Sequence, residues 1–150
     1  MAKRSNAPGG FLHHEENRQI EDAIASAEKT TSAEIKVVVV RHCWTDIKTK
    51  AASIFRKHQL DRTALRNCVL ILLVTTNHEF LIYGDEGIHQ KVGQGFWDDV
   101  RDEMTSLFKQ DRFGDGLAVA VQRIGEKLEH FFPRQDDDVN EVSDEVIHDE

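Results

Sequence analysis

Apolar residues are distributed along the chain in two distinct patterns. The first predicts an amphipathic helix over residues 15–29, because its apolar residues recur at three- and four-residue intervals: Ile20, Ala23, Ile24 and Ala27. The second is almost continuously apolar over residues 35–40 and 68–74, which is typical of strands covered on both faces. A short polar turn then leads into residues 80–83, a predicted hairpin partner of the second strand.

Three further helices complete the predicted order of elements. One helix is predicted to begin near Ile47, and a second covers residues 96–108. A third helix follows, and Pro133 ends it. A strand–helix–strand connection is right-handed and makes the two strands parallel, whereas a hairpin makes the third strand antiparallel. We therefore predict a three-layer α/β/α sandwich around a small mixed sheet, consisting of a parallel pair and an antiparallel hairpin strand.

The negative charge is concentrated at the end of the chain. The formal net charge is -8, and residues 135–150 contain eight acids and no Lys or Arg, so the rest of the chain is neutral. We predict a flexible segment over residues 1–10, one domain over residues 11–133, and a disordered acidic tail over residues 134–150. An alternative is a short amphipathic helix that forms on a basic partner, from an apolar stripe in the tail: Val139, Val142, Val146 and Ile147.

The same features restrict location and partners. A neutral body has no basic stripe for phosphates, so we expect no nucleic-acid partner. The longest apolar run, residues 68–74, is far shorter than the ~20 residues of a membrane-spanning helix. No apolar signal segment follows the first basic residues. We therefore expect a soluble, cytoplasmic chain without direct membrane insertion, and removal of a targeting segment from a longer precursor stays open.

Strand direction predicts where the chemistry-bearing residues gather. Glu34 precedes the first strand, Asn67 precedes the parallel second strand, and Asp85 follows the reversed third strand, so all three lie at one end of the sheet. The loop containing Asp61 opens there too. These oxygen donors predict a weak site for a hard cation, Ca²⁺ or Mg²⁺. The alternative is that they are turn and helix-cap residues.

Two arginines in the same loop change the electrostatics of this end. Arg62 and Arg66 would oppose a bound cation, or they would hold an anion themselves. The two cysteines add no chemistry: Cys43 and Cys68 are predicted at opposite ends of the sheet, too far apart for a disulfide. No motif identifies a nucleophile, and catalytic residues stay unassigned.

Four motifs in succession resemble the TPM domain, a family named after a thylakoid-lumen protein, a photosystem II repair protein and a modulator of acetylcholine receptors. The similarity extends over residues 11–133 and is carried by the order and spacing of SAEIKVVVV from Ser32, NCVLILL from Asn67, YGDEGIH from Tyr83 and FGDGL from Phe113. It implies an α/β/α fold. It also implies one of two functions: some plant members are described as acid phosphatases, and others bind calcium or act as non-enzymatic auxiliaries of membrane complexes.

The chain departs from the family pattern at the predicted cation site. The family's usual turn before the second strand is Asp-Asn-Gly with a further Asp upstream, whereas here it is Arg66-Asn67-Cys68, and Asp61 is the upstream acid. This change weakens a metal site transferred from the family. The signal peptide and membrane anchor of many bacterial relatives have no counterpart here, so the chain resembles a soluble, shorter branch.

Three functional hypotheses follow. The first is a non-catalytic interaction domain that serves a membrane- or envelope-associated process through a protein partner. The second is a divalent-metal-dependent acid phosphatase acting on phosphomonoesters, with the cation on Glu34, Asp61, Asn67 and Asp85. The third is a small-anion-binding module that uses Arg62 and Arg66.

Overall fold

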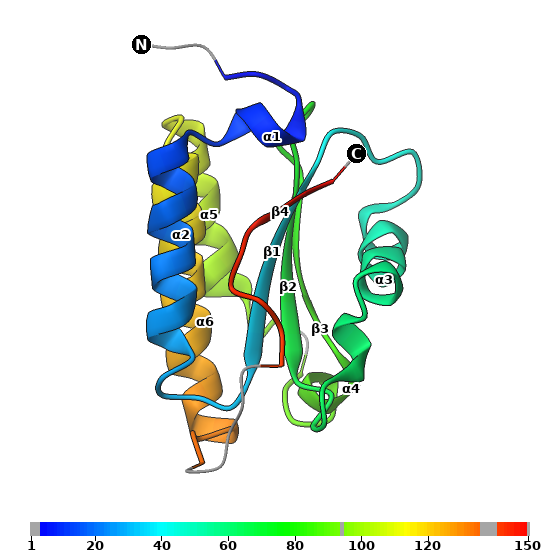
Figure 1. The fold of residues 1–150 in the computed structure, drawn as a ribbon, viewed down its shortest axis with the longest axis vertical. Coiled ribbons are helices and arrows are strands. Elements are labelled where there is room, and N and C mark those ends of the chain that lie inside the picture. The colour runs from blue at the N-terminus through cyan, green and yellow to red at the C-terminus, as the bar shows by residue number, and fades with distance from the viewer. Residues whose placement is uncertain (1–3, 94, 136–140, 150) are drawn as a thin grey trace.

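A computed structural model describes residues 4–93, 95–135 and 141–149 of the 150-residue chain. Its elements, in chain order, are α1 (Pro8–Phe11), α2 (His14–Ala27), β1 (Glu34–Val40), α3 (Ile47–Lys57), the 3₁₀ helix η1 (Leu60–Arg62), β2 (Cys68–Val74), β3 (Phe80–Gly84), α4 (Glu86–His89), α5 (Asp98–Lys109), α6 (Phe113–Phe131) and β4 (Ile147–Asp149). The sheet is sandwiched between α2, α5 and α6 on one face and α3 on the other (Figure 1). The predicted three-layer α/β/α sandwich is confirmed.

The sheet is mixed and has the order β3-β2-β1-β4. β1 and β2 are parallel, with Glu34 opposite Cys68 and Val40 opposite Val74. β3 is antiparallel to β2, with Val69 opposite Gly84. The predicted parallel pair and hairpin strand are therefore both confirmed, and β4 is an addition that the sequence did not indicate.

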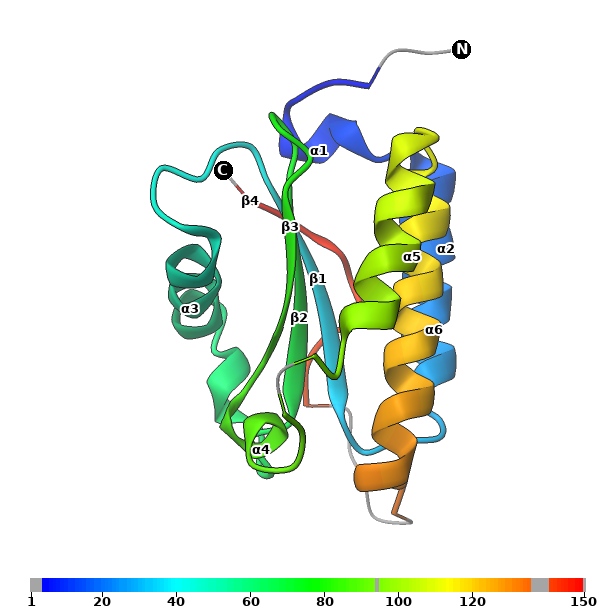
Figure 2. The ribbon, with the colours of Figure 1, turned by 180° about the vertical axis from the view of Figure 1, so that it is seen from behind.

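Alternating side chains of the two central strands fill two separate cores. On β1, Ile35, Val37 and Val39 face the layer formed by α2, α5 and α6, which Figure 2 shows from behind. Val38 and Val40 face α3 on the other side. Burying a side chain of this size stabilises a fold by roughly 1.5–3 kcal/mol, which explains why such continuously apolar segments occupy the centre of the sheet.

The end of the chain corrects the predicted disordered tail. β4 pairs in parallel with β1, placing Ile147 opposite Val38 and Asp149 opposite Val40. Val142 and Val146 are buried, so their apolar side chains join the cores and do not form a stripe on a helix. Val139 and the run Asp136–Asp138 lie outside the described residues.

Cationic side chains explain why the acidic segment packs against the body. Asp149 accepts hydrogen bonds from Lys57 at 2.7 Å and 3.0 Å, and it lies 3.0 Å from the ring of His58. Lys36 donates to the carbonyl of Ser143 at 2.8 Å. These contacts offset the repulsion among the acids, which composition alone suggested would keep the segment in solvent. Among the described residues, no helix has both the length and the apolar character needed to cross a bilayer.

Candidate functional site

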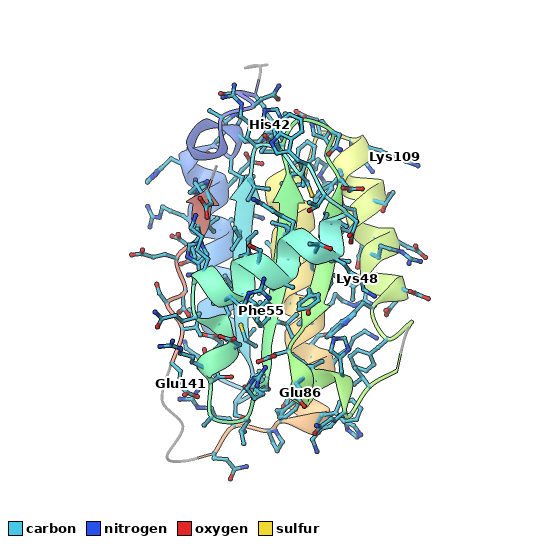
Figure 3. The ribbon with its side chains drawn as sticks, turned by 90° about the vertical axis from the view of Figure 1, so that its right-hand side faces the viewer. His42, Lys48, Phe55, Glu86, Lys109 and Glu141 are labelled. Carbon is cyan, nitrogen blue, oxygen red and sulfur yellow. The ribbon has the colours of Figure 1, made fainter. Side chains whose placement is uncertain are left out.

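The predicted gathering of polar residues occurs where β1 and β2 begin and β3 ends. Glu34 is opposite Cys68 in the register, and the amide of Asp85 donates to the carbonyl of Cys68 at 2.9 Å. Glu34 and Asp85 therefore flank one residue at the same end of the sheet, as strand direction predicted. Figure 3 shows this end of the α3 face, with Glu86 and Glu141 near it and His42 at the opposite end.

Asp85 is held by an arginine. The Nε of Arg66 donates to Oδ2 of Asp85 at 2.7 Å, and its Nη2 donates to Oδ1 at 2.9 Å. Oδ1 also accepts from the backbone amide of Glu86 at 2.8 Å, so Asp85 is the N-cap of α4. Both oxygens of a side chain that is only 6% exposed are thus already engaged. The bidentate geometry is the strongest form of an arginine–carboxylate contact, and Asp85 raises the pKa of Arg66 through it.

The backbone of the loop fixes this arginine in place. Arg66 adopts a left-handed conformation with φ of 50°, and its carbonyl accepts from the amide of Gly87 at 2.8 Å. A Cβ on residue 87 would collide with the carbonyls of Leu65 and Arg66, so only glycine permits this close approach. The turn before β2 and the start of α4 therefore form one packed unit.

Asn67 has a structural role at the same end. Its side-chain nitrogen donates to the carbonyl of Ser32 at 3.3 Å, and its backbone amide donates to the hydroxyl of Thr63 at 3.2 Å. Its carbonyl accepts from the amide of Glu34 at 3.3 Å. Asn67 thereby ties the loop before β2 to the start of β1, which agrees with the turn-residue alternative.

Glu34 belongs to a buried acidic pair that the sequence did not reveal. One oxygen of Glu34 accepts from the amide of Glu141 at 2.8 Å, and one oxygen of Glu28 accepts from the amide of Ile35 at 3.0 Å. The second oxygen of each, Oε2 of Glu34 and Oε1 of Glu28, is buried and has no hydrogen-bond donor. Two neighbouring buried carboxyl groups cannot both be ionised without a large energetic cost, so they need either a proton on one of them or a nearby cation.

A proton on Glu28 satisfies this requirement. Burial raises the pKa of Glu28 to about 10, and its hydrogen bond to Asp144 and the charge of Glu34 act in the same direction. Burial also raises the pKa of Glu34, against the opposing effect of the amide of Glu141. Protonated Glu28 is therefore a donor to its acidic neighbours at neutral pH, and it connects the end of α2 to the C-terminal segment.

The predicted cation ligands do not converge on one point. Neighbouring strands lie about 4.8 Å apart, so the backbones of Glu34 and Asp85 are separated by roughly 10 Å across β2. Asp85 faces Arg66, and Asp61 lies in η1, from which its charge acts on Arg66. Within residues 4–93, 95–135 and 141–149, no group of three or more His, Cys, Asp or Glu is arranged to hold a metal ion. In that same part of the chain, the buried side-chain oxygens without a hydrogen-bond partner are on Glu34 and Glu28.

The two arginines of the predicted anion pair point to different places. Arg66 is committed to Asp85, with Glu86 3.5 Å from its Nη1. Arg62 instead lines a cavity beside η1 and the C-terminal segment, together with Lys36. The sequence singled out Arg62 but missed Lys36, because a lysine in an apolar strand is usually read as a solvated residue.

Both cysteines are free thiols, as strand direction predicted. Cys68 is fully buried, and burial raises its pKa well above the ordinary value, with the carboxylates of Glu34 and Asp85 adding to the effect. Such a thiol is a poor nucleophile. Cys43 is partly exposed, and its Sγ lies 3.0 Å from the carbonyl of Thr45.

One signal in the sequence pointed to the missed acid. Glu28 follows Ile24 by four residues and Ile20 by eight, so it continues the apolar stripe of α2 onto the sheet. An acid at such a position is buried, and a buried carboxyl requires partners. Its partner Asp144 could not be found in the same way, because it comes from a segment more than 100 residues away.

Comparison with known proteins agrees with this architecture. The family profile described as the TPM domain matches residues 5–127. The NMR structure of BA42 protein from the psychrophilic bacterium Bizionia argentinensis is 36% identical, with a TM-score of 0.87, and the match covers 93% of this chain and 96% of that one. The N-terminal domain of a protein from P. gingivalis shares the fold at 16% identity, with a TM-score of 0.65 and coverage of 82% and 80%. Comparison with curated proteins gave no match. The chain belongs to the TPM domain family.

Proposed function

We propose that this TPM domain is a non-catalytic interaction domain that assists a membrane- or envelope-associated process by binding a protein partner. The observation that carries the proposal is Trp44, whose side chain is 88% exposed. Leaving so large an apolar surface in water is unfavourable, and burying it against a partner releases that free energy. Tryptophan is also among the residues most enriched at the energetic centres of protein interfaces.

The surroundings of Trp44 suit a binding surface. It lies in the connection between β1 and α3, at the end of the sheet opposite Glu34. The ring of His42 stacks on it, with centroids 4.9 Å apart and planes inclined by 26°. A stacked neighbour restricts the indole ring before binding, which lowers the entropy lost when a partner covers it.

The Arg66–Asp85 pair supports a role without catalysis. A carboxylate whose two oxygens already accept hydrogen bonds from a guanidinium is a poor ligand for a cation. Two other polar residues at that end, Asn67 and Glu34, join the loop and the C-terminal segment to the sheet. Their hydrogen bonds serve the architecture of the domain.

The proposal is tested by quantitative affinity capture with three immobilised proteins: the wild type, Trp44→Ala and Leu65→Ser. Leu65 is the matched control, because it is 55% exposed and lies at the other end of the sheet. We expect to capture a protein that binds both the wild type and Leu65→Ser. Its affinity for Trp44→Ala, measured with both proteins purified, should be at least tenfold lower. Equal affinity for all three would contradict the proposal.

The alternative function is a phosphatase that depends on Ca²⁺ or Mg²⁺ and acts on phosphomonoesters. It is favoured by one observation, the buried Oε2 of Glu34 that no donor contacts. Glu34, Asp61, Asn67 and Asp85 would hold the cation, which would activate water. For this to happen, Arg66 would have to leave Asp85. Calorimetry with millimolar calcium or magnesium tests it: binding to the wild type that Glu34→Gln abolishes supports the alternative, and an absence of binding eliminates it.

A further inference from the structure

A cavity of about 360 Å³ lies between η1, the end of α3 and the C-terminal segment. Three cationic or titratable side chains line it, Lys36, Arg62 and His58, and Glu141 is its acidic lining residue. Leu60 and Ile147 give it an apolar wall. Figure 3 labels one of its lining residues, Glu141, at the end of the sheet where β1 begins. This volume is within the range of small-molecule sites.

Lys36 is the unusual member of this cavity. It is only 3% exposed, and it is the third residue of β1, between Ile35 and a run of four valines. Within the described part of the chain, its ammonium group makes one hydrogen bond, to the carbonyl of Ser143 at 2.8 Å. An ammonium group has three donors, and a buried charge without a hydrogen-bonded counter-charge is costly. Burial accordingly lowers the pKa of Lys36, although Glu145 and Asp144 are near enough to favour its charge.

The side chains at the mouth leave further donors available. Arg62 is exposed, and its Nη1 makes a long contact of 3.4 Å to the side chain of Gln59. The Nε2 of the His58 ring lies 3.0 Å from Asp149, so this nitrogen is already engaged. Glu141 accepts from the amide of Ala64 at 3.2 Å. Among these lining residues, Lys36 and Arg62 are cationic and Glu141 is acidic, and Asp144 and Glu145 near Lys36 reduce the positive charge of the cavity.

We propose that this cavity binds a small organic monocarboxylate. The carboxylate lies between the ammonium of Lys36 and the guanidinium of Arg62, and the carbon skeleton lies against Leu60 and Ile147. The two cations can hold one carboxylate, whereas the second charge of a phosphate dianion faces the combined repulsion of Glu141, Asp144 and Glu145. The apolar wall favours a ligand with several carbons over a compact inorganic ion. The site is separate from Trp44, so its failure leaves the proposed interaction surface unaffected.

The experiment is an NMR titration of the ¹⁵N-labelled full chain at constant ionic strength. The probes are sodium hexanoate and sodium phosphate, with sodium chloride as the reference. We expect hexanoate to give saturable shifts that cluster at the amides of Thr63, Ala64, Val142 and Ser143. We expect phosphate to bind at least tenfold more weakly. Saturation by phosphate at equal or lower concentration would overturn the proposal, and so would hexanoate shifts that do not saturate.

Two arginine variants make the test specific. Arg62→Gln removes a cation from the mouth, and Arg56→Gln is the matched control, because Arg56 is exposed on α3 and does not line the cavity. We expect Arg62→Gln to weaken hexanoate binding about tenfold, the loss of one charge-assisted hydrogen bond, and Arg56→Gln to leave it unchanged. Lys36→Met is expected to abolish saturation. If Lys36→Met does not fold, the comparison of Arg62→Gln with Arg56→Gln still tests the proposal. Equal effects of these two substitutions on hexanoate binding would overturn the proposed site.

Discussion

Arg66, in the turn before β2, and Asp85, the N-cap of α4, form a two-point ion pair with N···O distances of 2.7 Å and 2.9 Å. An arginine in this turn gives the buried Asp85 carboxylate an attractive partner at this end of the sheet. The pair also joins the loop to the cap of α4. The ion pair therefore contributes to the stability of the domain and also keeps the Asp85 carboxylate from other ligands.

Removing Asp85 should destabilise the domain. Asp85→Ala deletes the cap of α4 and leaves the guanidinium without its partner, and we expect a loss of about 2 kcal/mol in the free energy of unfolding. Arg66→Gln should give a smaller decrease in melting temperature. Urea unfolding of both variants and of the double variant measures the coupling. Additive losses would show that the two side chains do not interact in solution.

The protonated state of Glu28 predicts an unusual dependence of stability on pH. Its folded pKa of about 10 lies above its ordinary value of 4.5, so its stabilising effect is complete below pH 4.5 and is lost as the pH rises towards 10. Glu28→Gln keeps the acceptor and removes the charge. We expect the variant to exceed the wild type in the free energy of unfolding by about 1–3 kcal/mol at pH 8, and the difference to shrink at pH 5.

The control for this prediction is Glu129→Gln, which alters an exposed acid on α6. Urea unfolding at pH 5, 7 and 9 gives the three pH dependences. The wild type and Glu129→Gln should lose stability in parallel with rising pH, whereas Glu28→Gln should lose less. Three parallel curves would mean that Glu28 is ionised in the folded protein.

The packed C-terminal segment predicts that a change near the end of the chain alters the core. Val146 is buried, and its amide donates to Glu21 at 3.0 Å. We expect Val146→Ala to lower the free energy of unfolding by about 1–2 kcal/mol, and Leu65→Ala, at an exposed position, by less than about 0.5 kcal/mol. Hydrogen exchange should show a protected amide at Val146. Rapid exchange there and a neutral Val146→Ala would indicate a solvated segment.

The two thiols should differ in reactivity. Cys68 is buried with a raised pKa, whereas Cys43 is partly exposed. Titration of the native protein with a disulfide reagent at pH 8 should modify one thiol per chain rapidly, and the second only after denaturation. Cys43→Ser identifies the fast thiol. A native Cys43→Ser protein that still reacts rapidly would show that the start of β2, where Cys68 lies, opens readily.

The sequence predicted those parts of the fold that depend on local pattern. The apolar runs at residues 35–40 and 68–74 identified the central strands, and chain direction then placed Glu34 and Asp85 at one end of the sheet. The partners of these acids depend on side-chain conformations and on distant segments. Charge composition suggested a solvated tail, but pairing with β1 and the buried Val146 provide enough contacts to hold residues 141–149.

The missed residues share one property: each is a polar side chain in an apolar position. Lys36 interrupts the apolar run of β1, and Glu28 continues the apolar stripe of α2. Their partners Ser143 and Asp144 could not be predicted from the sequence, because both come from the distant C-terminal segment. The hydrogen-bond partners of buried polar residues are therefore the part of the site that the sequence alone does not predict.

The most direct test of the central claim, that the Arg66–Asp85 pair belongs to a domain without phosphatase activity, is steady-state hydrolysis of p-nitrophenyl phosphate. The assay compares the wild type with Asp85→Ala, each with calcium, with magnesium and with chelator. We predict no saturable turnover by either protein under any of these conditions. Saturable turnover by the wild type that disappears in Asp85→Ala would contradict the account.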